Sequence, residues 1–253
     1  MTLSVWSYLI LCPLLFLAGL VDSIGGGGGL ISLPAYLLVG LPAHTAVATN
    51  KLSSAFGTSL TTARFLRNGL VNLRLAIPSA GAALAGAALG ARLSLLVDEG
   101  IMKWVLLGVL PLTALVVLNP RLFPDREDGR AEATPRTLAV CIACAFLIGS
   151  YDGFYGPGTG TFLIIAFTAL AGMGVKAANA QAKVINLSSN IASLTVFLLN
   201  GQVLIPLGLA GAASSMLGNW VGSGLALKRG GRIVRPVVLL VLGLLLVKAA
   251  AGY

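Results

Sequence analysis

Charged residues are scarce in this sequence. Asp, Glu, Lys and Arg make up 10% of its 253 residues, whereas they make up roughly a quarter of soluble domains. Hydrophobic residues account for 57%, and the mean hydropathy is +0.94. This composition excludes an ordinary soluble domain, and we expect a protein that crosses a membrane several times.

Histidine and cysteine are also rare. His44 is the only histidine, and the three cysteines, Cys12, Cys141 and Cys144, all lie in apolar stretches. They are too few for a disulfide framework, and we interpret the Cys-x-x-Cys spacing as core packing rather than as a redox motif. One histidine leaves no metal-ligating cluster and no Ser-His pair on separate helices. We therefore predict no metal, no cofactor and no enzymatic activity.

Basic residues exceed acidic ones, 17 against 8. They lie between apolar runs and not on a solvated face with aromatic neighbours, which excludes a nucleic-acid partner. No Lys or Arg precedes Lys51, so the N-terminus lacks the basic region of a signal peptide. We interpret residues 4–20 as a retained membrane segment.

Several apolar runs are long enough to cross a bilayer, which takes about 20 residues. They occupy residues 4–22, 44–66, 74–96, 101–118, 177–199, 203–227 and 233–250. Two other apolar tracts, 23–40 and 137–172, are interrupted by Gly25–Gly29 and Gly156–Gly160. Open backbone survives in hydrocarbon only where protein or a watery cavity covers it. We therefore expect each interruption to be the tip of a discontinuous or re-entrant helix.

The two halves of the chain repeat each other. At an offset of 130 residues, Gly19, Asp22, Gly26 and Gly28 coincide with Gly149, Asp152, Gly156 and Gly158. After two inserted residues the offset becomes 132, and it aligns Lys51, Phe65, Gly86 and Gly90 with Lys183, Phe197, Gly218 and Gly222. We predict one repeat at 1–118, a cytoplasmic linker at 119–136 and a second repeat at 137–253, together forming one transport unit.

Charge in the connections predicts opposite orientations for the two repeats. The connection 64–74 carries three arginines and its equivalent near 199–206 carries no basic residue, whereas 228–235 is basic and its equivalent 96–103 is net negative. Because Lys and Arg concentrate in short cytoplasmic loops, equivalent loops face opposite sides, and both termini are predicted outside. The predicted fold is an all-α polytopic membrane protein with two inverted-topology repeats, about eight full transmembrane helices and two Gly-broken segments.

Four ionisable residues lie inside apolar tracts: Asp22, Asp152, Lys51 and Lys183. A charge at the centre of a bilayer costs roughly 2.5–3.5 kcal/mol on insertion scales, so such residues are functional by default. Polar residues share a helix face with each lysine: Ser54, Thr58 and Thr61 with Lys51, and Asn179, Asn186, Asn190 and Ser193 with Lys183. Asn50 lies beside the first of these faces. Two alternatives stay open: two structural ion pairs, and polar contacts that only hold helices together.

The glycine-rich tips supply a complementary element. Flexible backbone followed by a short helix leaves free amide groups and a positive dipole end, which attract anions. Two such tips and two lysines that converge predict a site for a small anion.

The combined motifs resemble a known family. They are Ala18–Gly29, Leu33-Pro34, Ala48–Lys51, Tyr151–Gly160 and Ala182–Asn190. Over nearly the whole chain they look like the TauE/SafE sulfite-exporter permeases, in particular their YfcA-like branch. The resemblance implies a multi-pass bacterial inner-membrane permease for small sulfur-containing anions such as sulfite, sulfoacetate or related organosulfonates.

The resulting hypothesis is a secondary transporter that exports such an anion by alternating access at a midplane site, with proton entry as the driving force. The substrate-binding candidates are Lys51, Lys183, Asn50, Asn186, Asn190 and the tip amides at Gly26, Gly28, Gly156 and Gly158. The proton-coupling candidates are Asp22 and Asp152. A passive anion channel, a membrane scaffold and a carrier of another metabolite or cation are the alternatives. Beyond the substrate and the bilayer, a homodimer is a compatible partner.

Overall fold

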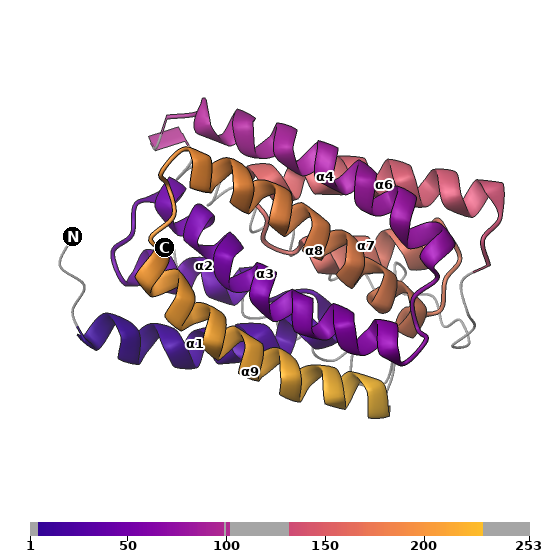
Figure 1. The fold of residues 1–253 in the computed structure, drawn as a ribbon, viewed down its shortest axis with the longest axis horizontal. Coiled ribbons are helices and arrows are strands. Elements are labelled where there is room, and N and C mark those ends of the chain that lie inside the picture. Colours follow the sequence, from indigo (N-terminus) through magenta and orange to yellow (C-terminus); the bar gives the residue numbers. More distant parts are fainter. Residues whose placement is uncertain (1–4, 99, 102–131, 230–253) are drawn as a thin grey trace.

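The computed structural model describes residues 5–98, 100–101 and 132–229, and within this part of the chain all regular elements are helices (Figure 1). Their bounds are Val5–Gly25 (α1), Gly29–Leu38 (α2), Ala43–Arg67 (α3), Leu73–Leu95 (α4), Pro135–Phe154 (α6), Thr159–Ala169 (α7), Val175–Leu199 (α8) and Ile205–Arg229 (α9). Helices α1, α4, α6 and α8 are long and apolar enough to cross a membrane. Helices α3 and α9 have 25 residues each and so extend about 37 Å.

The predicted spans at 44–66, 74–96, 177–199 and 203–227 correspond to α3, α4, α8 and α9, with ends that agree within two residues. Length and hydropathy sufficed here because each run is continuous. The spans predicted at 101–118 and 233–250 lie outside the described residues, apart from residue 101, and so does most of the linker 119–136.

Both predicted interruptions are present. Helix α1 ends at Gly25 and α2 begins at Gly29, while α6 ends at Phe154 and α7 begins at Thr159. Helices α2 and α7 have 10 and 11 residues, about half of what a bilayer crossing requires. In Figure 1 they lie toward opposite ends of the bundle.

The long helices pack side by side, and the two halves of the chain interleave. Helix α4 packs against α6 and α8, helix α9 packs against α1 and α3, and α3 also packs against α8. Each of these pairings joins the first half to the second half. Figure 1 shows α1, α3 and α9 running toward one end of the bundle, and α4, α6 and α8 running back. The two halves therefore form one body around a shared interior.

Glycines allow the closest of these helix pairs to touch. A Cβ at Gly90 on α4 would overlap the main-chain oxygen of Ser150 on α6, and a Cβ at Gly218 on α9 would overlap that of Phe16 on α1. Small residues let membrane helices approach at backbone distance. The Gly-x-x-x-Gly pairs Gly86–Gly90 and Gly218–Gly222 thus serve helix packing.

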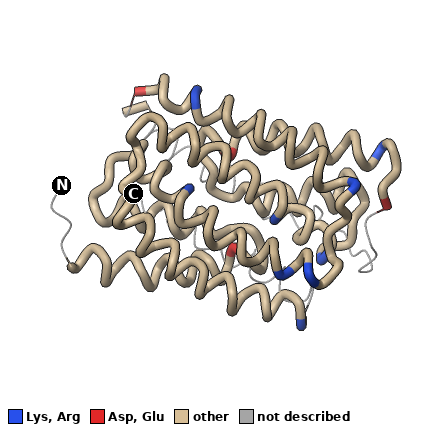
Figure 2. The backbone as a smooth tube through the Cα atoms, viewed as in Figure 1, with Lys and Arg blue, Asp and Glu red and all other residues tan. Residues whose placement is uncertain are grey.

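Basic residues gather at one end of the bundle, the right-hand end in Figure 2. Helices α3 and α9 end there, and α4, α6 and α8 begin there. Arg64 and Arg67 lie in the last turn of α3. Helix α1 begins at the opposite end.

Candidate functional site

The two helix breaks lie against each other inside the bundle. Gly26 has a φ of +76°, a left-handed conformation that favours glycine, and a Cβ there would overlap the backbone of Gly160. A Cβ on Gly160 would in turn lie 2.6 Å from Cα of Gly26. The Thr161 hydroxyl donates a hydrogen bond of 2.8 Å to the carbonyl oxygen of Gly25. The tips of the two halves therefore touch directly and leave no room for side chains between them.

Two polar side chains on one face of α8 cap the C-terminal end of α1. The Lys183 ammonium lies 2.8 Å from Oδ2 of Asp22 and also donates to the Asp22 main-chain oxygen. One turn earlier, the Asn179 amide donates to the carbonyl oxygens of Ser23, at 3.3 Å, and Ile24, at 3.0 Å. The last carbonyls of a helix have no partner within it. The Asn179 amide satisfies two of them here, and the Lys183 ammonium shares the Asp22 carbonyl oxygen with the backbone amide of Gly26. The positive charge also suits the negative end of the helix dipole.

A second ion pair joins α3 to α6. Nζ of Lys51 lies 2.8 Å from Oδ2 of Asp152, with the two side chains 3% and 2% exposed. The carboxylate also accepts a hydrogen bond of 2.7 Å from the Thr159 hydroxyl and one of 2.6 Å from the Ser189 hydroxyl. Gly156 has a φ of +100° and lies next to the Lys51 ammonium, since a Cβ on Gly156 would be 2.9 Å from Nζ of Lys51.

Each ion pair joins one half of the chain to the other. Lys183 binds the aspartate of the first half, and Lys51 binds the aspartate of the second half. The two ion pairs that the sequence left open as an alternative are both formed. Each ammonium is neutralised by a carboxylate, so an arriving anion has to compete with that carboxylate.

The predicted asparagines are buried on the same two helices. Oδ1 of Asn50 accepts a hydrogen bond of 3.4 Å from Ser54, and Asn190 donates one of 3.2 Å to Oδ1 of Asn186. Helices α3 and α8 pack together at these faces, and the Thr62 hydroxyl donates to the main-chain oxygen of Lys183. The polar faces of α3 and α8 thus lie in the interior and not against lipid.

A small cavity adjoins Asp22. Its volume is about 20 Å³, which suffices for about one water molecule. Its polar lining comes from four helices and consists of Asp22, Ser32, Ser53, Ser54, Thr58, Ser215 and Asn219. Gly28 and Gly29 line it as well, and a Cβ at Gly28 would lie 2.5 Å from Cβ of Asp22. The hydroxyl of Ser32 is buried and has no hydrogen-bond partner among the residues that the structure describes.

Sequence reasoning missed Ser32, Ser53, Ser215 and Asn219 as cavity residues. One signal was available: Ser215 and Asn219 are four residues apart on an apolar helix and therefore share a face. Asn219 accepts a hydrogen bond of 2.7 Å from Thr61 on α3, so this face is turned inward.

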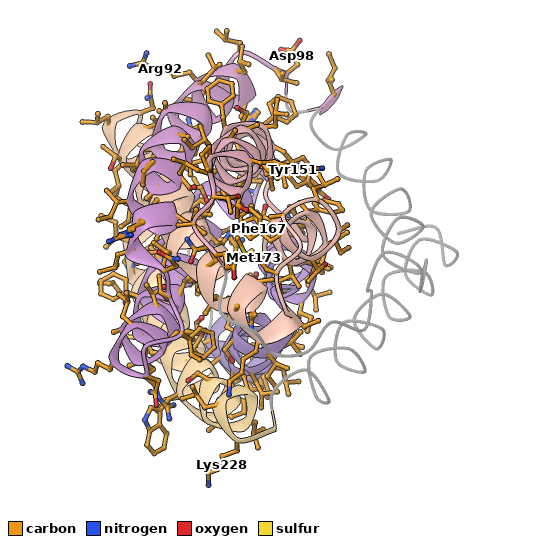
Figure 3. The ribbon with its side chains drawn as sticks, turned by 90° about the vertical axis from the view of Figure 1, so that its right-hand side faces the viewer. Arg92, Asp98, Tyr151, Phe167, Met173 and Lys228 are labelled. Carbon is orange, nitrogen blue, oxygen red and sulfur yellow. The ribbon has the colours of Figure 1, made fainter. Side chains whose placement is uncertain are left out.

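Aromatic contacts brace the second break. The Tyr151 hydroxyl donates a hydrogen bond of 2.6 Å to the carbonyl oxygen of Pro157, and its ring meets the Phe162 ring edge-on at 5.5 Å between centroids. Gly158 has a left-handed φ of +84° immediately before α7. In Figure 3, which looks at the bundle from the basic end, Phe167 and Met173 lie in the interior, and both are almost fully buried.

The described part of the chain contains eight helices, four of which are able to cross a membrane, and two breaks between helices that meet beside buried ion pairs. These features define an all-helical, multi-pass membrane protein. Residues 11–249 match the family described as sulfite exporter TauE/SafE. The chain belongs to this family, which confirms the resemblance seen in its motifs.

Several relatives match over most of their length. The chain is 40% identical over 227 residues to "Probable membrane transporter protein ORF9" of a Sinorhizobium species, covering 89% of this chain and 85% of the relative. It is 37% identical to a "Probable membrane transporter protein" of Haemophilus influenzae, covering 89% and 87%. It is 34% identical to "Probable membrane transporter protein YfcA" of Escherichia coli, covering 89% and 82%. No solved structure matches the chain.

Proposed function

We propose that this protein is a secondary transporter that carries a small sulfur-containing anion, such as sulfite or an organosulfonate, across the bacterial inner membrane. The family description and the names of the relatives support a membrane transporter. The observation that carries the proposal is the pair of buried, cross-half Lys–Asp contacts where the two helix breaks meet.

The packing supports two inverted repeats. Helices α1 to α4 of the first half correspond in order to α6 to α9 of the second. Under this correspondence the contact between α4 and α6 is equivalent to the contact between α9 and α1. In the same way, the contact between α3 and α9 is equivalent to the contact between α8 and α4. Equivalent long helices run in opposite directions in Figure 1. With the basic end cytoplasmic, this arrangement puts the beginning of α1 outside and supports the prediction of a periplasmic N-terminus. The prediction for the C-terminus falls on residues outside the described part of the chain. Inverted repeats with broken helices are typical of carriers that work by alternating access.

The ion pairs can bind an anion and a proton together. A sulfite or sulfonate oxygen is an acceptor for the Lys183 ammonium just as the Asp22 carboxylate is. A carboxylate that loses its lysine to the anion becomes a buried unpaired charge, so its protonation is favoured. The sequence analysis predicted export driven by protons that enter as the anion leaves. The ion-pair chemistry favours co-transport instead, and we propose that proton and anion leave together, down the gradient of the anion.

The alternative of a passive anion channel requires a continuous wet path. In the described part of the chain the tips are joined by ion pairs, and the cavity beside Asp22 has room for about one water molecule, which supports a carrier over a channel.

Flux of labelled sulfite into proteoliposomes tests the proposal. We expect uptake that depends on the protein and falls to the level of empty liposomes in Lys183→Ala. Lys176→Ala is the matched control, because Lys176 begins the same helix and lies outside the ion pairs, and it should keep its flux. Undiminished flux in Lys183→Ala removes this lysine from the mechanism, and sulfite conductance indifferent to a pH gradient identifies a channel.

A further inference from the structure

The two ion pairs are equivalent in the proposed repeat, but their surroundings differ. Asp152 accepts hydrogen bonds from Thr159 and Ser189 in addition to its contact with Lys51. At the repeat offsets of 130 and 132, the residues equivalent to Thr159 and Ser189 are Gly29 and Gly57. Neither glycine has a hydroxyl. The carboxylate of the first half therefore lacks the two donors that fix the carboxylate of the second half.

Asp22 is accordingly less enclosed. Among the described residues, Lys183 is the only side chain that donates to its carboxylate, and its side chain is 16% exposed, against 2% for Asp152. Beside Asp152, two hydroxyl groups occupy the space next to the carboxylate. Beside Asp22, Gly29 and the cavity occupy the equivalent space.

Ser54 and Thr58 in the cavity lining have polar equivalents in the other half, but four other polar positions of the lining have apolar equivalents. Ser32, Ser53, Ser215 and Asn219 line the cavity; their equivalents are Phe162, Ile185, Ala83 and Ala87. The lining residues from α2, α3 and α9 are all neutral. Lys183 from α8 is therefore the one charged group of the described elements that faces Asp22. A water molecule in this cavity would have hydroxyl partners and direct access to the carboxylate.

From this asymmetry we propose that Asp22 is the carboxylate that exchanges protons, and that Asp152 stays ionised and serves as a fixed clamp between the halves. This inference rests on the proposed transport function. A hydronium ion in the cavity transfers its proton to a carboxylate oxygen of Asp22, which leaves a water molecule and a neutral carboxyl group. The Lys183 ammonium keeps its protons and its hydrogen bond to the Asp22 main-chain oxygen, so it stays in place with its charge available to the anion.

Infrared difference spectra between neutral and acidic pH test this assignment on the full chain in lipid, with no anion substrate present. The chain has only eight carboxylic side chains, and all except Asp22 and Asp152 lie in polar connections between apolar runs. We expect a band from a buried protonated carboxyl that is absent in Asp22→Asn and unchanged in Asp152→Asn. A band that disappears in Asp152→Asn and persists in Asp22→Asn overturns the proposal, as does the absence of any such band in the folded wild type.

A second variant covers the case in which Asp152→Asn does not fold. Ser189→Ala removes one donor and keeps both the carboxylate and Lys51, so the Asp22 band should persist in it and vanish in the double variant Asp22→Asn, Ser189→Ala. A band that survives in that double variant belongs to another carboxyl group and contradicts the assignment. The infrared test uses no substrate, so it is independent of the transport assay. If Asp22 takes up a proton in a protein that does not transport sulfite, the transport proposal is overturned and the assignment of Asp22 stands.

Discussion

Replacement of Asp152 by Asn should destabilise the protein more than replacement of Asp22. Both changes leave a buried lysine without its carboxylate, but Asp152 is 2% exposed and also holds Thr159 and Ser189, whereas Asp22 is 16% exposed and adjoins a cavity that can admit water. Breaking a buried ion pair by removing one partner costs about 3–5 kcal/mol. At roughly 2–4 °C per kcal/mol for a chain of this size, the melting temperature should fall by on the order of 10 °C.

Thermal unfolding in detergent, followed by intrinsic fluorescence, measures this effect. Asp98→Asn is the control for the loss of one negative charge, because Asp98 is exposed, and it should melt like the wild type. The double variant Lys51→Met, Asp152→Asn removes both charges and should recover most of the lost stability. Equal melting temperatures for Asp152→Asn and the wild type, or a larger fall for Asp22→Asn, would refute the reasoning.

Three further outcomes are expected. Gly26→Ala should prevent correct folding, because the added Cβ overlaps the backbone of Gly160. Gly40 has a similar φ and nothing within 4 Å of an added Cβ, so Gly40→Ala should cost about 1 kcal/mol of stability. Expression level and melting temperature distinguish the two variants, and equal values would contradict the contact between the tips. Asn179→Leu should lower the melting temperature by several degrees, because it uncaps two buried carbonyls at about 1–3 kcal/mol each; a neutral result would contradict the capping role. Binding of sulfoacetate, whose sulfonate stays ionised, should be accompanied by proton uptake in a weakly buffered solution containing a pH dye; proton release would contradict co-binding.

Much of the fold could be predicted from the sequence, because two simple quantities determine it. The length of apolar runs located α3, α4, α8 and α9, and the glycine clusters located both breaks. The hydrocarbon interior leaves few alternatives to helices, so these signals are more dependable here than in a soluble protein.

The pairing of the charged residues could not be predicted, because it depends on how the halves interleave. Each lysine had one aspartate in its own half and one in the other, and both partners were chemically equivalent. The packing of α8 against the end of α1, and of both α3 and α6 against α8, brings the cross-half partners together. Sequence spacing carries no information on that choice.

The cavity beside Asp22 could not be predicted from the sequence, for a related reason. The difference between Gly29 and Thr159, or between Gly57 and Ser189, becomes meaningful only once Asp22 and Asp152 are known to lie beside them. The repeat is visible in the sequence through the residues that its two copies share, whereas the cavity lies at positions where the copies differ.

Ligand-induced stabilisation tests the central claim most directly, because a ligand that binds the folded protein raises its melting temperature. The panel is sulfite, sulfoacetate, sulfate, thiosulfate and taurine, each added to the wild type, to Lys183→Ala and to Lys176→Ala. The account predicts that sulfite or sulfoacetate raises the melting temperature of the wild type and of Lys176→Ala and leaves Lys183→Ala unshifted. An equal shift in Lys183→Ala, or no shift of the wild type by any anion of the panel, would contradict an anion site at the buried ion pairs.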